Sequence, residues 1–404
     1  MIYLISFAVF SGVTLSLVFL LLFVESRLVK KEDSHIRING DEEKTLVVSS
    51  GTTLLSSLVS QGILLPSACG GGGTCGMCKC RVTAGGGDVL PTELAHLNRR
   101  EKSEGVRLAC QLKVRNDMAI EIPEEIFSIR KYHATVVSNN NVATYIKELV
   151  LRVDPDEDFD FEAGQYIQID IPEYRLSFKD FNIGSAYVDD WDKYQLWNIQ
   201  TRSEERVFRA YSLANPPYER EPRLTVRIAT PPEEKENAPP GVGSSYIFSL
   251  REGDAVTFSG PYGDFLVKDT KREICFVGGG AGMAPMRSHI LHQLNTLKTD
   301  RRITFWYGAR SRREMFYDEE FRALSETCPN FRYQVALSEP LPADAWEGPT
   351  GFIHQVLYDT YLKDHKDPTE IEYYLCGPPV MVDAVVDILF NLGVEEEMIA
   401  YDKF

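Results

Sequence analysis

Cysteine residues restrict what this chain can fold into more than any other feature of its sequence. Cys69, Cys75 and Cys78 enclose the glycine run 70–73, and Cys110 follows after a long gap. Four thiolates at this spacing can hold two irons bridged by two sulfides, with one tetrahedral site per iron. Because glycine lacks a Cβ, the run can take positive φ and bring backbone N–H groups close to the sulfides. The sequence therefore predicts a [2Fe–2S] cluster held by these four cysteines.

Zinc and a disulfide pair are the alternative interpretations of these cysteines. Zinc sites usually combine two separated C-x2-C pairs, whereas this sequence has only the pair formed by Cys75 and Cys78. Eight cysteines in 404 residues are also too few for a disulfide scaffold. Cys80 lies in a predicted strand just beyond the loop, and we do not expect it to bind iron.

The first 24 residues contain no charged side chain and are dominated by Leu, Val, Phe and Ile. A helix of this length can cross a hydrocarbon core of about 30 Å. Basic residues follow the segment but none precedes it, so the positive-inside rule puts the remainder of the chain in the cytoplasm. A cleaved signal peptide is the alternative, but the segment lacks a basic n-region. We expect an uncleaved transmembrane anchor over 1–24 and a charged linker over 25–34.

Residues 35–126 are expected to form the cluster-binding domain. Two alternating apolar segments, 36–38 and 45–48, flank an Asn-Gly dipeptide, which is a strong hairpin signal. Thr52 is a candidate N-cap for a helix that leads into the cysteine loop. A hairpin, a helix and then the cluster loop is the order of the β-grasp ferredoxin fold.

Residues 131–268 are expected to form an antiparallel β-barrel. Candidate strands separated by turn residues indicate a small barrel. They cover 133–137, 146–153, 166–171, 207–213, 224–229 and 255–259. Between two of them, residues 172–206 are longer than an ordinary loop and rich in aromatic side chains. This insertion is either a docking surface or a segment that packs on its own barrel.

Residues 271–404 alternate short apolar runs with helical segments. Runs such as 274–277, 303–307, 333–337 and 373–375 alternate with candidate helices. This βαβ pattern predicts an α/β domain with a doubly wound parallel sheet.

A short motif in the predicted barrel carries the signals for a flavin. Alternation along a strand puts Arg209 and Tyr211 on one face and Ala210 and Ser212 on the other. An arginine can pair with a pyrophosphate and a tyrosine can stack on a flavin. The Ser212 hydroxyl can hydrogen-bond flavin N5, the atom that receives a hydride. Taken alone, the motif also fits an ordinary barrel strand.

Three turns further along the chain strengthen the interpretation as a dinucleotide enzyme. One opens a short helix whose backbone N–H groups favour a phosphate. The second follows a predicted strand and precedes a helix, as a phosphate-binding turn requires. The third, which contains Cys376, ends another strand of the same sheet, where ligands of such sheets bind. A structural cysteine is the alternative for Cys376. The turn residues expected to contact the cofactors are Gly243, Ser244, Ser245, Gly279, Gly280, Ala281, Gly282, Gly377 and Pro378.

In this order, the Arg-Ala-Tyr-Ser motif, the glycine turn and the Cys-Gly-Pro-Pro turn resemble the ferredoxin–NADP⁺ reductase superfamily. A [2Fe–2S] domain behind an N-terminal apolar segment narrows the resemblance to the F subunits of sodium-translocating NADH:quinone oxidoreductases. The resemblance covers essentially the whole chain, and residues 279–288 and 305–310 are its most specific phrases.

The resemblance implies FAD, NADH and a [2Fe–2S] cluster, in a bacterial inner-membrane complex of six subunits. NADH would give a hydride to FAD, and single electrons would pass to the cluster and on to membrane subunits. These would reduce ubiquinone and export sodium. The implied catalytic residues are Ser212, Cys376 and Phe404. In the superfamily a terminal aromatic residue often covers the flavin, although a frayed terminus is the ordinary alternative for Phe404.

The net charge of −16 argues against nucleic acid as a partner. A reductase component of a bacterial oxygenase has the same three modules and is the main alternative function. A membrane-tethered electron carrier with a degenerate reductase half is a further one. Charge alone leaves NADPH open as a substrate, because Arg310, Arg312 and Arg313 could favour a 2′-phosphate.

Overall fold

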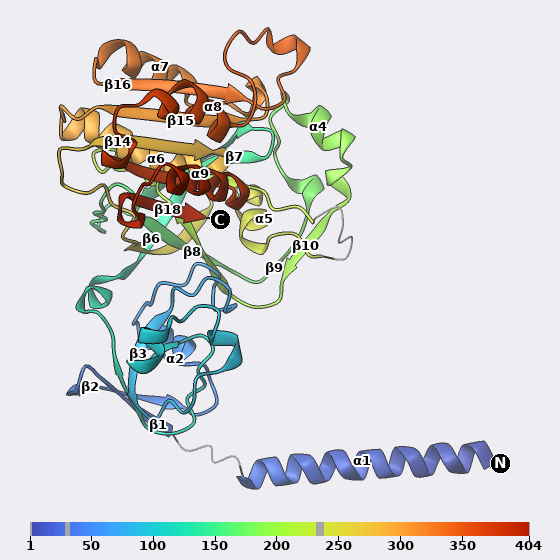
Figure 1. Cartoon of the computed structure of the whole chain (residues 1–404). Coiled ribbons are helices and arrows are strands. Elements are labelled where there is room, and N and C mark those ends of the chain that lie inside the picture. Colours follow the sequence, from blue (N-terminus) through green and yellow to red (C-terminus); the bar gives the residue numbers. More distant parts are fainter. Residues whose placement is uncertain (1, 29–32, 232–237, 404) are drawn as a thin grey trace. The chain divides into compact units, whose positions relative to one another are not determined.

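The computed structural model describes residues 2–28, 33–231 and 238–403. The chain divides into two compact units, Met1–Ser128 and Ile129–Phe404, which are described separately below. Figure 1 labels their helices and strands in sequence order.

The first unit contains a five-stranded sheet in the order β2-β1-β5-β3-β4. Strands β1 and β5 are parallel, and the remaining neighbours are antiparallel. Mixed pairing of this kind, with helix α2 beside the sheet, agrees with the expected β-grasp fold. The elements are α1 (Ile2–Leu28), β1 (Asp33–Ile38), β2 (Asp41–Ser49), α2 (Leu54–Ser60), β3 (Lys79–Ala84), α3 (Arg99–Ser103), β4 (Val106–Leu108) and β5 (Met118–Glu121).

Helix α2 begins one residue later than the sequence predicted. Thr53, in an extended conformation, is the N-cap, and its hydroxyl accepts from the backbone N–H of Ser56 at 3.1 Å. The hydroxyl of Thr52 instead donates to the carbonyl of Ser49. Two adjacent threonines offer the same capping group, so sequence alone could not decide between them.

Residues 2–28 form the single helix α1, which includes most of the expected anchor. Within the described residues, no helix is both long enough and apolar enough to cross a membrane. The anchor therefore stays a prediction.

The second unit begins with a six-stranded antiparallel sheet in the order β11-β8-β13-β6-β7-β12. Each of the six strands predicted for the barrel corresponds to one of them. Their inward side chains form one buried cluster that includes Val136, Leu149, Ile169 and Phe258. The elements are β6 (Arg130–Ala143), β7 (Ile146–Val153), β8 (Tyr166–Ile171), β11 (Val207–Ser212), β12 (Arg223–Arg227), α5 (Val242–Ser249) and β13 (Ala255–Tyr262).

The aromatic insertion packs on its own barrel. It consists of β9 (Tyr174–Ser177), α4 (Val188–Lys193) and β10 (Gln200–Ser203), with β9 and β10 paired. Phe178 and Trp191 are fully buried against Phe248 of α5. The indole N–H of Trp191 also donates to the carbonyl of Thr144 at 3.0 Å. These contacts favour the packing alternative for most of the aromatic side chains.

The remainder of the second unit is a parallel sheet in the order β16-β15-β14-β17-β18, coloured yellow to red in Figure 1. This order, which reverses at β14, agrees with the predicted doubly wound fold. The elements are β14 (Glu273–Gly279), α6 (Met283–Leu291), β15 (Ile303–Ala309), α7 (Asp318–Thr327), β16 (Phe331–Leu337), α8 (Ile353–Thr360), β17 (Ile371–Gly377), α9 (Pro379–Asn391) and β18 (Ile399–Lys403).

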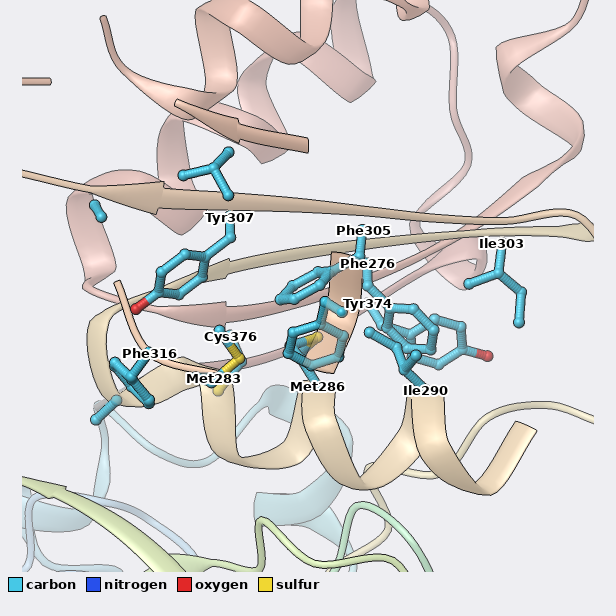
Figure 2. Packing of buried hydrophobic residues seen from close by; sticks show 14 of the residues in the cluster. Phe276, Met283, Met286, Ile290, Ile303, Phe305, Tyr307, Phe316, Tyr374 and Cys376 are labelled. Atoms are coloured by element: carbon cyan, nitrogen blue, oxygen red, sulfur yellow. The ribbon is translucent and has the colours of Figure 1, made fainter. Parts of the chain in front are cut away.

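Alternate residues of these strands face opposite helical layers. Phe276 and Phe305 pack with Met286 of α6, as Figure 2 shows, and α7 adds Phe321 to the same cluster. The neighbouring strand residues pack with α8 and α9 on the other face. Because helices cover both faces of the sheet, successive residues of each strand are buried on alternate sides. The strands therefore appear in the sequence as continuous apolar runs.

Arg287 joins the barrel to the parallel sheet. It lies on α6, just beyond the glycine turn, and its side chain is 6% exposed. The guanidinium donates to the carbonyl of Ala214 at 3.0 Å and to both oxygens of Glu219, all in the loop after β11. It also pairs with Glu320 of α7 at 2.7 Å. These bonds fix the glycine turn relative to the end of the flavin-type strand.

Replacing Arg287 with Ala should lower the free energy of unfolding of the second unit by about 3 kcal/mol. The carboxylates of Glu219 and Glu320 are partly removed from water, and the variant leaves them without the cation that compensates their charge. Arg322→Ala is the matched control. Arg322 pairs with Asp318 but its side chain is 52% exposed, so its loss should be below about 1 kcal/mol. Urea unfolding followed by tryptophan fluorescence measures both, since all four tryptophans lie in this unit. Equal small losses in the two variants would contradict this account.

Candidate functional site

The four cysteines expected to bind the cluster meet in two pairs. The Sγ atoms of Cys69 and Cys75 are 3.3 Å apart, and the thiols of Cys78 and Cys110 are hydrogen-bonded to each other. Cys78 directly precedes β3 and Cys110 closely follows β4. Because β3 and β4 are antiparallel, these two ends meet.

In the described part of the chain, no three His, Cys, Asp or Glu side chains are grouped so as to hold one metal ion. Two thiols per iron is the number that a [2Fe–2S] cluster takes from its protein, since sulfides complete each tetrahedron.

In each pair, the hydrogen bond between the two thiols lowers the pKa of one cysteine and raises the pKa of the other. The Cys75 thiol lowers the pKa of Cys69 to about 3, and backbone N–H groups of Cys75 and Thr74 act in the same direction. The Cys78 thiol likewise lowers the pKa of Cys110 to about 6. Thiolates are the form that binds metal.

Glycine is required where the loop turns towards the sulfur atoms. Gly73 has a φ of 76°, and a Cβ there would lie 2.4 Å from Nε2 of Gln111, which is 3.6 Å from the Cys110 sulfur. The backbone N–H of Gly73 contributes to lowering the pKa of Cys110. The donor set and the glycine-lined loop therefore fit a [2Fe–2S] cluster. Cys80 lies apart from this group, in β3, where burial raises its pKa to about 12.

The flavin-type motif forms β11, and the phosphate-type turn lies directly against it. A Cβ on Gly243 would come within 2.5 Å of the Tyr211 hydroxyl and 2.7 Å of Cγ of Arg209. The first turn of α5, which also contains Ser244 and Ser245, is thus held beside an arginine and a tyrosine. An N-terminal helix turn, a guanidinium and an aromatic ring at close approach fit the pyrophosphate and ribityl portions of a flavin dinucleotide.

The glycine turn after β14 and the turn after β17 touch each other. A Cβ on Gly282 would lie 2.1 Å from the carbonyl oxygen of Cys376, so no other residue fits there without a shift. A cavity of about 620 Å³ opens beside the two turns. Among the predicted cofactor residues, Gly279, Gly280, Ala281 and Pro378 line it. Its position at the carboxyl ends of parallel strands is where a nucleotide binds in such a sheet.

Ser212 and Cys376 are brought together through a residue that the sequence analysis missed. The Ser212 hydroxyl lies 3.4 Å from a carboxylate oxygen of Asp402. Asp402 is the register partner of Cys376 across β17 and β18. Burial raises the pKa of Asp402, partly offset by the hydrogen bond from Ser212, and burial and the nearby Asp402 raise the pKa of Cys376. A hydroxyl, a carboxyl and a thiol therefore converge where the flavin-type strand meets the nucleotide sheet.

Asp402 could hardly have been found from sequence. Strand β18 has five residues and is apolar over only part of its length, so nothing in its pattern predicts a strand. The neighbouring Phe404, expected to cover the flavin, lies outside the described residues, and its role stays a prediction. Tyr145 and Arg227, which also line the cavity, were missed because they come from the barrel.

Comparison with known proteins supports this division of the chain. Residues 36–115 match the family of 2Fe-2S iron-sulfur cluster binding domains, and residues 276–387 match the oxidoreductase NAD-binding domain. The F subunit of the Na(+)-translocating NADH-quinone reductase of Neisseria gonorrhoeae is 53% identical over 98% of this chain and 97% of its own length. That of Pasteurella multocida is 53% identical over 98% of both chains. This chain belongs to the F subunits of the Na(+)-translocating NADH-quinone reductases.

Solved structures of the wider superfamily share the fold of this chain. The Amycolatopsis cytochrome P450 reductase GcoB has a TM-score of 0.63 at 25% identity, covering 92% of this chain and 98% of its own. The ferredoxin reductase of carbazole 1,9a-dioxygenase has a TM-score of 0.60 at 25% identity over the same shares. The expected resemblance to the reductase superfamily is thus confirmed.

Replacing any one of Cys69, Cys75, Cys78 or Cys110 with Ala should abolish the EPR signal of the reduced cluster, because one iron then lacks a thiolate. Flavin content should remain, since the flavin-type motif lies in the other unit. Cys80→Ser is the matched control and should keep the signal. A normal signal in Cys110→Ala, or its loss in Cys80→Ser, would contradict the assignment.

Proposed function

We propose that this chain is the NADH-oxidising, electron-input subunit of a sodium-translocating NADH:quinone oxidoreductase. When bound, FAD accepts a hydride from NADH and the [2Fe–2S] cluster carries single electrons onward. The relatives' name supports the wider activity, in which membrane subunits reduce quinone and sodium is exported. The observation that carries the proposal is the convergence of Ser212, Asp402 and Cys376, because it joins the flavin-type strand to the end of β17, and the turn that follows β17 lines the nucleotide cavity.

Each element of the second unit has a separate task in this proposal. Arg209, Tyr211 and the first turn of α5 hold the dinucleotide portion of FAD. The glycine turns hold NADH, and Ser212 orients flavin N5. We also propose that Phe404 covers the flavin until NADH arrives, since an aromatic ring can stack there. A Phe404 deletion with unchanged NADH affinity would count against that role.

The domain limits that we propose are those of the sequence analysis. They are 1–24 for the anchor, 25–34 for the linker, 35–126 for the ferredoxin domain, 131–268 for the FAD domain and 271–404 for the NADH domain. The oxygenase-reductase alternative draws on two solved structures at 25% identity, a cytochrome P450 reductase and the ferredoxin reductase of carbazole 1,9a-dioxygenase. Full-length relatives at 53% identity favour the quinone reductase.

The proposal is tested by mixing the full chain with NADH without oxygen. Flavin absorbance should bleach and the EPR signal of the reduced cluster should follow. Sodium should stimulate NADH:quinone activity in membranes that contain the chain. Failure of NADH to bleach a fully loaded flavin would overturn the proposed function.

Replacing Asp402 with Asn should slow flavin reduction by NADH at least about tenfold, because a hydrogen-bonded acidic group at the reacting centre is lost. The wild-type pH–rate profile should show one ionisation above the ordinary range of Asp, as the raised pKa of Asp402 requires. That ionisation should vanish in the Asn variant. Exposed Asp359→Asn serves as the control. An unchanged profile in Asp402→Asn would remove this residue from the mechanism.

We propose that the N-terminal segment is a single-pass anchor in the bacterial inner membrane, with the catalytic domains in the cytoplasm. Its support is the charge-free sequence of the first 24 residues and the continuous helix α1. A chain shortened to begin at Ser34 should remain in the supernatant after ultracentrifugation and should still reduce ferricyanide with NADH. The full chain should sediment with membranes. Equal partition of the two chains would exclude an anchor.

A further inference from the structure

The order of the strands fixes which side of the cavity receives the adenosine of the nucleotide. The glycine turn that suits a pyrophosphate follows β14, and Cys376 ends β17 beside it. Strands β15 and β16 lie on the opposite side of β14 from β17. A nucleotide whose nicotinamide lies over β17 must therefore extend its adenosine towards the ends of β15 and β16. This step rests on the proposed function.

A basic and an acidic residue face each other at those two strand ends. The backbone N–H of Glu339 donates to the carbonyl of Arg310 at 2.7 Å, which continues the pairing of β15 with β16. The Arg310 Nε atom is consequently 3.6 Å from a carboxylate oxygen of Glu339. Arg310 and Ser338, which precedes Glu339, both line the cavity. The pair therefore lies at the end of the cavity assigned to the adenosine ribose.

The surroundings of Arg310 hold its guanidinium in place. Its side chain is hydrogen-bonded to Tyr194 of the insertion, and the carboxylates of Glu339 and Glu314 add favourable charge. Glu314 lines the same cavity. Arg310 therefore lies close to two carboxylates, and Arg227 of β12 is the other arginine that lines the cavity.

Arg312 and Arg313, the other two arginines that could favour a 2′-phosphate, form contacts away from the cavity. Arg313 forms ion pairs with Asp189 at 2.7 Å and Asp190 at 2.8 Å, both on α4 of the insertion. Arg312 donates to the backbone carbonyl of Asp344 at 3.2 Å. Neither lines the cavity. Arg310 is therefore the one of the three that could reach a 2′-phosphate.

We propose that Glu339 selects NADH against NADPH. Its carboxylate can accept hydrogen bonds from the ribose hydroxyls of NADH, and hydrogen bonds to an ionised acceptor are stronger than those between neutral groups. Towards NADPH it acts in two ways: it repels the 2′-phosphate, and it occupies the guanidinium that would otherwise bind that phosphate. The side chains of Arg310 and Glu339 are 57% and 70% exposed, so the pair contributes little to folding and can be changed without unfolding the domain.

The test compares Glu339→Gln with the wild type in the full, cofactor-loaded chain. Calorimetry measures the dissociation constants of NAD⁺ and NADP⁺, and steady-state assays with ferricyanide measure kcat/KM for NADH and NADPH. Glu339→Gln should tighten NADP⁺ binding and raise kcat/KM for NADPH at least about fivefold, the effect of one charge pair at about 4 Å in water. The values for NAD⁺ and NADH should change by less than about threefold, since neutral Gln still hydrogen-bonds a hydroxyl.

Two further variants make the result specific. Glu326→Gln removes the same charge from an exposed site on α7 and should leave both nucleotides unchanged. In the double variant Glu339→Gln/Arg310→Ala, the gain for NADPH should disappear because the freed guanidinium is missing. The same NADP⁺ to NAD⁺ preference in Glu339→Gln and wild type would overturn this inference. Failure of the wild type to oxidise NADH would instead overturn the proposed function, so the two failures are distinguishable.

Discussion

The ionic contacts of Arg287 set the geometry on which the remainder of the catalytic unit depends. Transfer of a hydride requires the donor and acceptor rings to lie about 3–3.5 Å apart. The two rings would be held by different domains, so a small relative shift of those domains would separate them. Arg287 fixes the loop that follows Ser212 to the helix that follows the glycine turn, through Ala214 and Glu219. On the same side of the barrel, the Ser212 hydroxyl lies 3.4 Å from a carboxylate oxygen of Asp402 on β18, which gives a second contact between the barrel and the parallel sheet.

The elements that could be predicted from sequence are those in which local pattern and tertiary environment agree. Strands β7 and β8 were predicted to the residue because each is rich in β-branched, leucine or tyrosine side chains and is bounded by turn residues. The cysteine loop was predictable because its chemistry depends on spacing alone. Strand β18 was not, because five residues carry too little periodicity and its identity as a strand comes from pairing with β17. Asp402 was missed for the same reason.

The charged residues around the nucleotide cavity also could not be predicted from sequence, because strand pairing brings them together. Arg310 and Glu339 are far apart in the chain and become neighbours only through the parallel pairing of β15 with β16. The aromatic insertion shows the same limit. Its composition left both docking and packing open, and the structure shows Trp191 buried against Phe248 of α5. The insertion also reaches the nucleotide domain through Asp189, Asp190 and Tyr194, so it braces the outer wall of the cavity.

The central claim is that hydride transfer takes place where Ser212, Asp402 and Cys376 converge. A crystal structure of the full chain with FAD and NAD⁺ bound tests it most directly. The account predicts the Ser212 hydroxyl within about 3 Å of flavin N5, a hydrogen-bonding distance. It also predicts the nicotinamide ring between the flavin and Cys376, with the adenosine ribose beside Glu339. A nicotinamide bound away from β17, or a flavin N5 facing another strand, would contradict the account.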